Sequence, residues 1–340
     1  MSTRFKTAAV VGAGAWGTAL AQTLARGGLD VTLWAHEPAT ARDIDERHEN
    51  PVFLRDVPLE PSIRSTSRIL EAVAEKDLLV WATPAQHLRP TLADSEMTRP
   101  EGVPILIASK GVEGMSGLLM SEIAAQIAPE NPVAVLSGPT FAREVAEGKP
   151  TAVTLACADE ALCARLAASC AAPSFRVYRS DDVTGAQIGG AVKNVVALAC
   201  GIVEGRGMGD NARAALMTRG LSEMVRLGVA KGGRAETLMG LSGLGDLALT
   251  CNNDQSRNMR LGIAIGSGMS RHDAMDHPDL GLRHSVVEGV EGAHSVGQLA
   301  ANLGVEMPIC RAVAAILHEG ADVGATIAAL LARPLKDERQ

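Results

Sequence analysis

The sequence predicts an α/β domain with a doubly wound, mostly parallel sheet, followed by an all-α domain. In the first half of the chain, apolar runs typical of strands alternate with helical patterns, and after about Tyr178 only helical patterns remain. We therefore expect one domain over residues 1–180 and a second over residues 181–340. The 340 residues are 46% hydrophobic, which is enough for two domains with separate cores.

Seven apolar runs in the first half are predicted to be strands, because turn residues bound most of them. They are TAAVVGAG, DVTLWAH, DLLVWATP, VPILIASKG, VAVLSGP, TAVTLACAD and SFRVYRS. Between them, WGTALAQTLARGG and LLMSEIAAQIA have helical spacing, and Gly27 and Gly28 supply a stop for the first helix. Strands that alternate with helices predict a sheet that is covered on both faces.

From Asp181 onward, apolar or amphipathic helical segments are separated by glycine clusters and no β-alternation is visible. The clearest helices are DDVTGAQIGGAVKNVVALACGIVEG, DNARAALMTRGLSEMVRLGVAKGG and PICRAVAAILHEG. The terminal LKDERQ is predicted to fray. This second half therefore forms a helical domain that would carry the substrate and the catalytic residues.

Composition excludes several classes of function. The net charge of −7 and the 2% of aromatic residues argue against nucleic-acid partners and anionic membrane surfaces. The start lacks the shape of a signal peptide, and we expect no later stretch to be long and apolar enough to span a membrane. The six scattered cysteines predict reduced thiols in a cytoplasmic protein, and the eight histidines show no metal-ligand spacing.

A glycine motif, GAGAWG, follows the first predicted strand and opens the first helix. Its three glycines would permit, in order, a tight turn, close approach of a pyrophosphate to the backbone, and close packing of helix on strand. The phosphates would bind free N–H groups at the helix N-terminus. We therefore predict a Rossmann-type dinucleotide site whose contacts include Gly12, Gly14, Ala15, Trp16 and Gly17.

The end of the second predicted strand selects the cofactor. A site specific for NAD places Asp or Glu there to hold the ribose hydroxyls. This chain has LWAHEP, in which His36 stands at the tip and Glu37 comes slightly late. Because no carboxylate at the tip repels a 2′-phosphate and His36 can donate to one, NADP is favoured over NAD.

Lys193 is a charge in the middle of GGAVKNVVALACGIVEG, an otherwise buried helical pattern. Its stem could simply lie along apolar surface while the ammonium reaches water. However, Gly189 and Gly190 share its helix face and have no side chains to crowd the ammonium, so room is left beside it. A lysine with space around it and apolar flanks is a candidate for acid–base chemistry.

Other polar residues stand out among glycines and apolar residues. Lys110 ends the predicted strand ASKG, where α/β sheets bind ligands, although a solvated loop lysine is an alternative. Asp246 lies in GLSGLGDL without neighbouring charges. Ser256 is a natural N-cap for a helix that would begin with Arg257 and Asn258. The start of this helix would form an anion site, or it would be only a capped helix with an exposed arginine.

Taken together, these stretches resemble the bacterial NAD(P)-dependent glycerol-3-phosphate dehydrogenases along nearly the whole chain. Each match is modest by itself, whereas their order and separation are highly specific. One departure is Asn253, where a serine is expected on a loop. The matching stretches are VVGAGAWGTALA, ASKG, LSGPTFAREVA, GGAVKNVVALACGI, GLSGLGDLALTC with SRN, and VVEGVEGA.

The resemblance implies a role for each matching residue. Lys193 corresponds to the proton donor and acceptor, and Lys110 resembles a residue that touches both cofactor and substrate. The expected substrate contacts are Lys110, Gly138, Thr140, Lys193, Asp246, Ser256, Arg257 and Asn258. The expected cofactor-side residues beyond the glycine motif and His36 are Lys110, Ala142, Arg257, Val286 and Glu288. Asn194 lies about 100° round the helix from Lys193, so we expect it to border the same pocket.

The implied reaction interconverts dihydroxyacetone phosphate and glycerol 3-phosphate with NAD(P)H and supplies glycerol 3-phosphate for phospholipid synthesis. Asp246 would orient Lys193 or bind a substrate hydroxyl. Two alternatives stay open: a related dehydrogenase of the 6-phosphogluconate or 3-hydroxyacid type, and a non-catalytic protein that senses NADP. The apolar helical domain also suits a homodimer interface.

Overall fold

The computed structural model describes residues 4–283 and 286–334. Its first half contains all seven predicted strands and one further strand, β3. The predicted tail 335–340 lies outside the described residues. The strands are β1 (Thr7–Val11), β2 (Asp30–Trp34), β3 (Arg64–Thr66), β4 (Leu78–Trp81), β5 (Ile105–Ile107), β6 (Val133–Ser137), β7 (Thr151–Cys157) and β8 (Phe175–Ser180).

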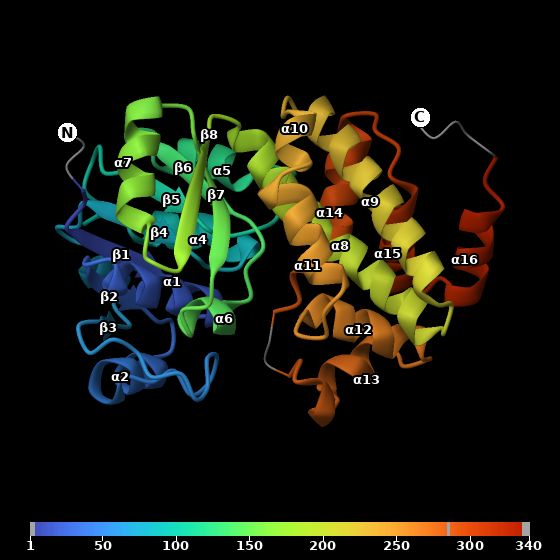
Figure 1. Ribbon diagram of the computed structural model, residues 1–340, viewed down its shortest axis with the longest axis horizontal. Helices are drawn as coiled ribbons and strands as arrows, with labels where there is room; N and C mark the ends of the chain where they lie inside the picture. Colours follow the sequence, from blue (N-terminus) through green and yellow to red (C-terminus); the bar gives the residue numbers. More distant parts are fainter. Residues whose placement is uncertain (1–3, 284–285, 335–340) are drawn as a thin grey trace.

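The strands form one sheet in the order β3-β2-β1-β4-β5-β6-β7-β8, at the left of Figure 1. All neighbours are parallel except β6 and β7, which are antiparallel. The predicted doubly wound, mostly parallel sheet is therefore confirmed. Its edge strand β3 was missed because it has only three polar residues, Arg64–Thr66, and no apolar run.

Both faces of the sheet are covered, as β1 illustrates. Ala8 and Val10 belong to one apolar core, whereas Ala9 and Val11 belong to another on the opposite face. The helices of this domain are α1 (Ala15–Arg26), α2 (Pro38–Arg47), α3 (Ile69–Val73), η1 (Ala85–His87), α4 (Leu88–Asp94), α5 (Met120–Ile127), α6 (Ala142–Ala146) and α7 (Glu160–Cys170). Residues of α1, α2 and α7 enter the first core, and those of α3, α4 and α5 enter the second.

After β8 the described chain is helical, which confirms the predicted all-α second domain. Asp182 caps the first of these helices by accepting from the N–H of Gly185. The helices are α8 (Val183–Gly205), α9 (Asp210–Ala230), α10 (Ala235–Leu238), η2 (Leu241–Gly245), α11 (Asp246–Cys251), α12 (Arg257–Gly266), α13 (Arg271–Asp276), η3 (Pro278–Leu280), α14 (Glu288–Asn302), α15 (Pro308–His318) and α16 (Val323–Leu331).

Helix α8 is the core of this second domain and packs against α9, α11, α12, α14 and α15 (Figure 1). Its 23 residues are long and apolar enough to cross a membrane by length and composition, so the expectation that no such stretch exists is wrong. The whole apolar window is nevertheless buried inside the protein. The apolar character of α8 therefore reflects its contacts with other helices.

Glycines let the backbone of α8 touch its neighbours. A Cβ at Gly189 would lie 2.2 Å from the carbonyl oxygen of Ser242 in η2, and a Cβ at Gly201 would lie 2.3 Å from that of Met259 in α12. Such distances exclude any side chain unless the backbone shifts. The close approach of η2 to α8 places the start of α11, and with it Asp246, against the face of α8 that carries Lys193.

We expect Gly189→Ala to lower the free energy of unfolding by about 1–3 kcal/mol, because the new methyl group would overpack the contact with Ser242. Chemical denaturation of the purified variant measures the change. Gly297→Ala is the matched control, since Gly297 lies inside α14 and no neighbouring segment comes within 4 Å of the place that its methyl group would take. There the substitution should stabilise the helix by about 0.5–1 kcal/mol. Equal effects at both positions would contradict the close contact.

Candidate active site between the sheet and the helical domain

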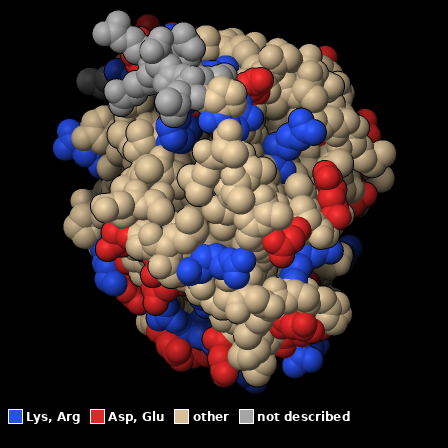
Figure 2. Space-filling model, turned by 90° about the vertical axis from the view of Figure 1, so that its right-hand side faces the viewer, with Lys and Arg blue, Asp and Glu red and all other residues tan. Residues whose placement is uncertain are grey.

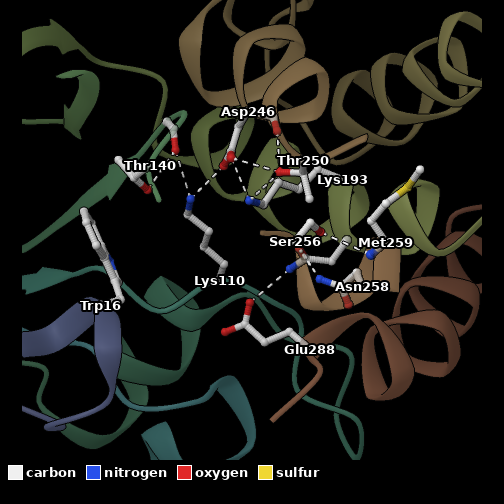
Figure 3. Close-up of polar contacts among 12 residues, drawn as sticks. Trp16, Lys110, Thr140, Lys193, Asp246, Thr250, Ser256, Asn258, Met259 and Glu288 are labelled. Carbon is white, nitrogen blue, oxygen red and sulfur yellow. Dashed lines mark hydrogen bonds and ion pairs between the residues drawn. The ribbon is translucent and has the colours of Figure 1, made fainter. Parts of the chain in front are cut away.

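Lys193 projects from the middle of α8, and only a small part of its side chain is exposed to water. Its side chain is 10% exposed, and its ammonium binds Asp246 Oδ1 at 2.6 Å and Thr250 Oγ1 at 3.1 Å (Figure 3). The alternative of a lysine that extends along apolar surface to solvent is therefore wrong. The charge is buried and held by two oxygens from α11.

Asp246 joins Lys193 to a second lysine. The carboxylate is fully buried, and its Oδ2 binds the ammonium of Lys110 at 2.7 Å (Figure 3). Lys110 comes from the loop after β5 and also donates to the carbonyl oxygen of Gly138, after β6, at 3.0 Å. The carboxyl ends of two sheet strands thus meet helices α8 and α11 at one carboxylate.

The electrostatics of this cluster favour an anionic ligand. Two lysines share one carboxylate, so the cluster carries an excess positive charge when all three groups are ionised. Burial lowers the pKa of Lys110 below its ordinary value; Asp246 opposes this shift and the charge of Lys193 adds to it. A cation at this place is costly to the protein, which is typical of a functional site.

The glycines beside Lys193 do not leave empty space, which corrects the sequence-based interpretation. The η2 backbone fills the place next to Gly189, and a Cβ at Gly190 would lie 3.2 Å from Cγ of Lys110. The missing side chains admit Lys110 and the η2 backbone instead. Gly189 and Gly190 do mark the site, but they do so because they allow close packing and not because they leave a space.

A second polar cluster adjoins Lys193 through its neighbour Asn194. The Asn194 amide donates to Glu288 at 3.0 Å and accepts from the amide of Asn258 at 2.9 Å. Asn258 in turn accepts from the backbone N–H of Gly289 at 2.9 Å. Helices α8, α12 and α14 therefore meet at these two buried amides, of which Asn258 lies below Lys193 in Figure 3.

The turn between β1 and α1 fits a dinucleotide. Gly12 has φ +116°, and a Cβ there would lie 2.9 Å from the backbone of Ala82. A Cβ at Gly17 would lie 1.8 Å from the carbonyl oxygen of Gly12, whereas the place beside Gly14 is open. No side chain caps α1, so its first N–H groups are available to phosphate. Trp16 donates from its indole to the carbonyl of Ala108 and fixes the neighbouring strand end.

At the tip of β2, His36 is exposed and its ring lies edge-on to Trp34, with the centroids 5.9 Å apart. Glu37 is the N-cap residue of α2, but its side chain makes no capping hydrogen bond. Both side chains therefore lie at the surface where the adenosine end of a dinucleotide binds in this fold.

The remaining candidate residues lie around these clusters. Ser256 is the N-cap of α12 and accepts from the N–H of Met259 at 3.2 Å, which confirms the predicted cap. Arg257 is exposed at the first position of that helix, and Val286 is 44% exposed shortly before α14. Thr140 donates to the carbonyl of Gly138, and Ala142 begins α6.

Sequence reasoning missed Thr250. Its hydroxyl contacts the Lys193 ammonium and donates to the backbone carbonyl of Asp246 at 2.6 Å. The spacing held a signal, because Thr250 follows Asp246 by four residues and shares its helix face. That signal had meaning only once α11 was known to face Lys193.

Comparisons with known proteins agree with this architecture. Residues 7–163 match the model of the NAD-dependent glycerol-3-phosphate dehydrogenase N-terminus, and residues 182–328 match that of its C-terminus. The chain is 55% identical over 330 residues to a glycerol-3-phosphate dehydrogenase [NAD(P)+] of Rhodospirillum rubrum, covering 97% of this chain and 93% of that protein. It is 52% identical over 334 residues to the Caulobacter vibrioides protein of the same name, covering 98% and 99% of the two chains.

Among solved structures, the crystal structure of glycerol-3-phosphate dehydrogenase from Coxiella burnetii is similar, with a TM-score of 0.91 and 36% identity. The alignment covers 96% of this chain and 99% of that one. Both halves of the chain, the glycine-lined turn and the helical domain therefore have counterparts in one family. This chain belongs to the NAD-dependent glycerol-3-phosphate dehydrogenase family.

Proposed function

We propose that this protein interconverts dihydroxyacetone phosphate and glycerol 3-phosphate with NAD(P)H. The observation that carries the proposal is the buried Lys110–Asp246–Lys193 cluster, in which strand ends that face a dinucleotide site meet the helical domain. Membership of the family supports the same reaction. A protein that only senses NADP has no need of two buried lysines at this place.

Lys193 is the acid and base of the proposed reaction. When bound, the nicotinamide supplies or accepts the hydride. The Lys193 ammonium donates to the ketone oxygen and delivers its proton as negative charge develops there, and it takes the proton back in reverse. Asp246 and Thr250 hold the ammonium in place through the contacts at 2.6 and 3.1 Å. Lys110 adds positive charge on the opposite oxygen of Asp246.

The phosphate of the substrate is proposed to bind at the N-terminus of α12. Ser256 already caps one N–H of this ten-residue helix, and Arg257 and Asn258 begin it. The helix dipole and the guanidinium favour an anion there. Binding of the phosphate would supply energy that fixes the reacting carbon near the hydride.

On the cofactor side we propose a preference for NADP over NAD, because His36 is exposed at the tip of β2 and can donate to a 2′-phosphate. The nicotinamide half is proposed to be lined by Lys110, Ala142, Arg257, Val286 and Glu288.

We also propose that the two domains have different roles. Residues 1–180 bind the dinucleotide, and residues 181–340 supply most substrate contacts.

The experiment that tests the reaction follows oxidation of NADPH and of NADH by the purified protein with dihydroxyacetone phosphate. Unphosphorylated dihydroxyacetone is the control. We expect oxidation only with the phosphorylated ketone, and the ratio of the two rates measures the cofactor preference. No oxidation of either cofactor would overturn the proposed substrate and turn attention to other phosphorylated or acidic carbonyl compounds.

A cytoplasmic homodimer is the proposed form of the protein. Helix α16 is strongly apolar, yet none of its described residues is buried, and Leu331 is 76% exposed. Together with α9 and α15 it lines an apolar groove that includes Met208, Leu216, Val229 and Ile327. Figure 2 shows the right-hand side of the molecule as a mostly uncharged surface. A second copy would cover this apolar area, and the molecular mass in solution, measured by light scattering, tests the dimer.

A further inference from the structure

Two buried asparagines form a continuous hydrogen-bonded chain across three helices. The backbone N–H of Gly289 donates to Asn258, the amide of Asn258 donates to Asn194, and the amide of Asn194 donates to Glu288. The three distances are 2.9, 2.9 and 3.0 Å. Asn194 and Asn258 are 4% and 7% exposed, so water does not compete freely for these bonds.

The chemistry of its two ends fixes the direction of every bond in this chain. A backbone N–H can only donate, so it must meet the carbonyl oxygen of Asn258, whose NH₂ then faces Asn194. Asn194 therefore presents its own oxygen to Asn258 and its NH₂ to Glu288, which accepts as a carboxylate. Neither amide can flip without placing two donors or two acceptors against each other.

The chain is also tightly enclosed. A Cβ at Gly289 would lie 2.5 Å from Oδ1 of Asn258 and 2.6 Å from the carbonyl oxygen of Asn194. Helix α14 can therefore approach α8 and α12 this closely only with glycine at position 289. The enclosure keeps Glu288 and Asn258 at a fixed separation, with Asn194 between them.

We propose that Asn194 is a positioning residue, which holds Glu288 and Asn258 in register rather than binding the substrate itself. This inference rests on the proposed function, in which Glu288 faces the cofactor and Asn258 faces the substrate phosphate. One amide next to Lys193 thus links the two binding regions. A change at Asn194 should then weaken both cofactor and substrate binding, although it removes no group that touches either.

The polarity of the chain provides a sharp test with Asn194→Asp, Glu288→Gln and the double variant. Asn194→Asp keeps an oxygen for Asn258 but sets a second carboxylate against Glu288, which is unfavourable in a buried place. Glu288→Gln places an amide donor opposite the carboxylate that Asn194→Asp introduces. The double variant has the same net charge as the wild type. The measurements are the Kd for NADPH without substrate and the KM for dihydroxyacetone phosphate.

We expect Asn194→Asp to raise both constants about tenfold, the effect of one misplaced buried hydrogen bond. The double variant should return to within about threefold of Glu288→Gln alone. Asn302→Asp makes the same chemical change at the exposed end of α14 and should leave both constants unchanged.

Three outcomes would overturn the positioning role. In the first, Asn194→Asp leaves both constants as in the wild type. In the second, it changes only the melting temperature. In the third, Glu288→Gln does not restore binding to Asn194→Asp, which is the result expected if Asn194 touches the substrate directly. Failure of the proposed function is distinguishable, because the wild type would then not oxidise NADPH with dihydroxyacetone phosphate. In that case the Kd for NADPH across the same variants still decides the inference.

Discussion

Lys193→Ala is expected to lower turnover of dihydroxyacetone phosphate by roughly 10²- to 10⁴-fold, the usual contribution of a positioned general acid. The substitution removes the only ammonium that both Asp246 and Thr250 hold in the described structure. Cofactor affinity should change little, because the dinucleotide turn at Gly12–Gly17 belongs to a different domain. Steady-state rates and NADPH binding, measured on the same preparation, separate the two effects.

The variant also needs a test of folding, since it leaves Asp246 with Lys110 as its remaining charged partner. Circular dichroism and NADPH binding identify a folded protein. Lys149→Ala is the matched control, because Lys149 is an exposed lysine whose ion pair with Glu147 lies at the surface. It should retain the turnover of the wild type. A folded Lys193→Ala protein with turnover close to that of the wild type would exclude Lys193 as the acid.

The elements of the fold with strong local patterns could be predicted from the sequence. An apolar run, a glycine turn and helical spacing predict β1 and α1. Ser256 likewise predicts the start of α12 from its local sequence. β3 could not be predicted in this way, because its three polar residues form a strand only by pairing with β2. Its existence depends on the neighbouring strand rather than on its own pattern.

The candidate site divides in the same way. Lys193, Lys110 and Asp246 were conspicuous as charges among glycines and apolar residues, yet no local pattern states that two lysines share one carboxylate. That arrangement depends on contacts across 53 and 136 residues of sequence. The spacing of Thr250, four residues after Asp246, identifies it only when the position of Lys193 against α11 is known, because a threonine at this spacing is common on helices.

Asp246→Asn is expected to lower the free energy of unfolding by about 3–5 kcal/mol, since it removes the carboxylate that two buried ammonium groups share. The asparagine can accept from one lysine but carries no charge to balance either. Turnover should fall as well, because Lys193 loses the oxygen that orients it. Asp181→Asn is the matched control: Asp181 pairs with Arg234 at the surface, and its loss should leave stability nearly unchanged.

The pH dependence of this loss follows from Lys110. Burial lowers the pKa of Lys110 in the folded protein, and the charge of Asp246 partly opposes this shift. Removal of the Asp246 charge should therefore lower the pKa of Lys110 further. Between the lowered pKa and the ordinary value near 10.4, the unfolded chain binds more protons than the folded one, so stability rises with pH. In Asp246→Asn this range extends to lower pH than in the wild type. Urea denaturation at a series of pH values below the ordinary pKa of lysine should therefore show the destabilisation shrinking as the pH rises. A loss that is constant over this range would mean that Lys110 stays fully protonated without Asp246, and that the carboxylate positions the lysines without being needed to keep them charged.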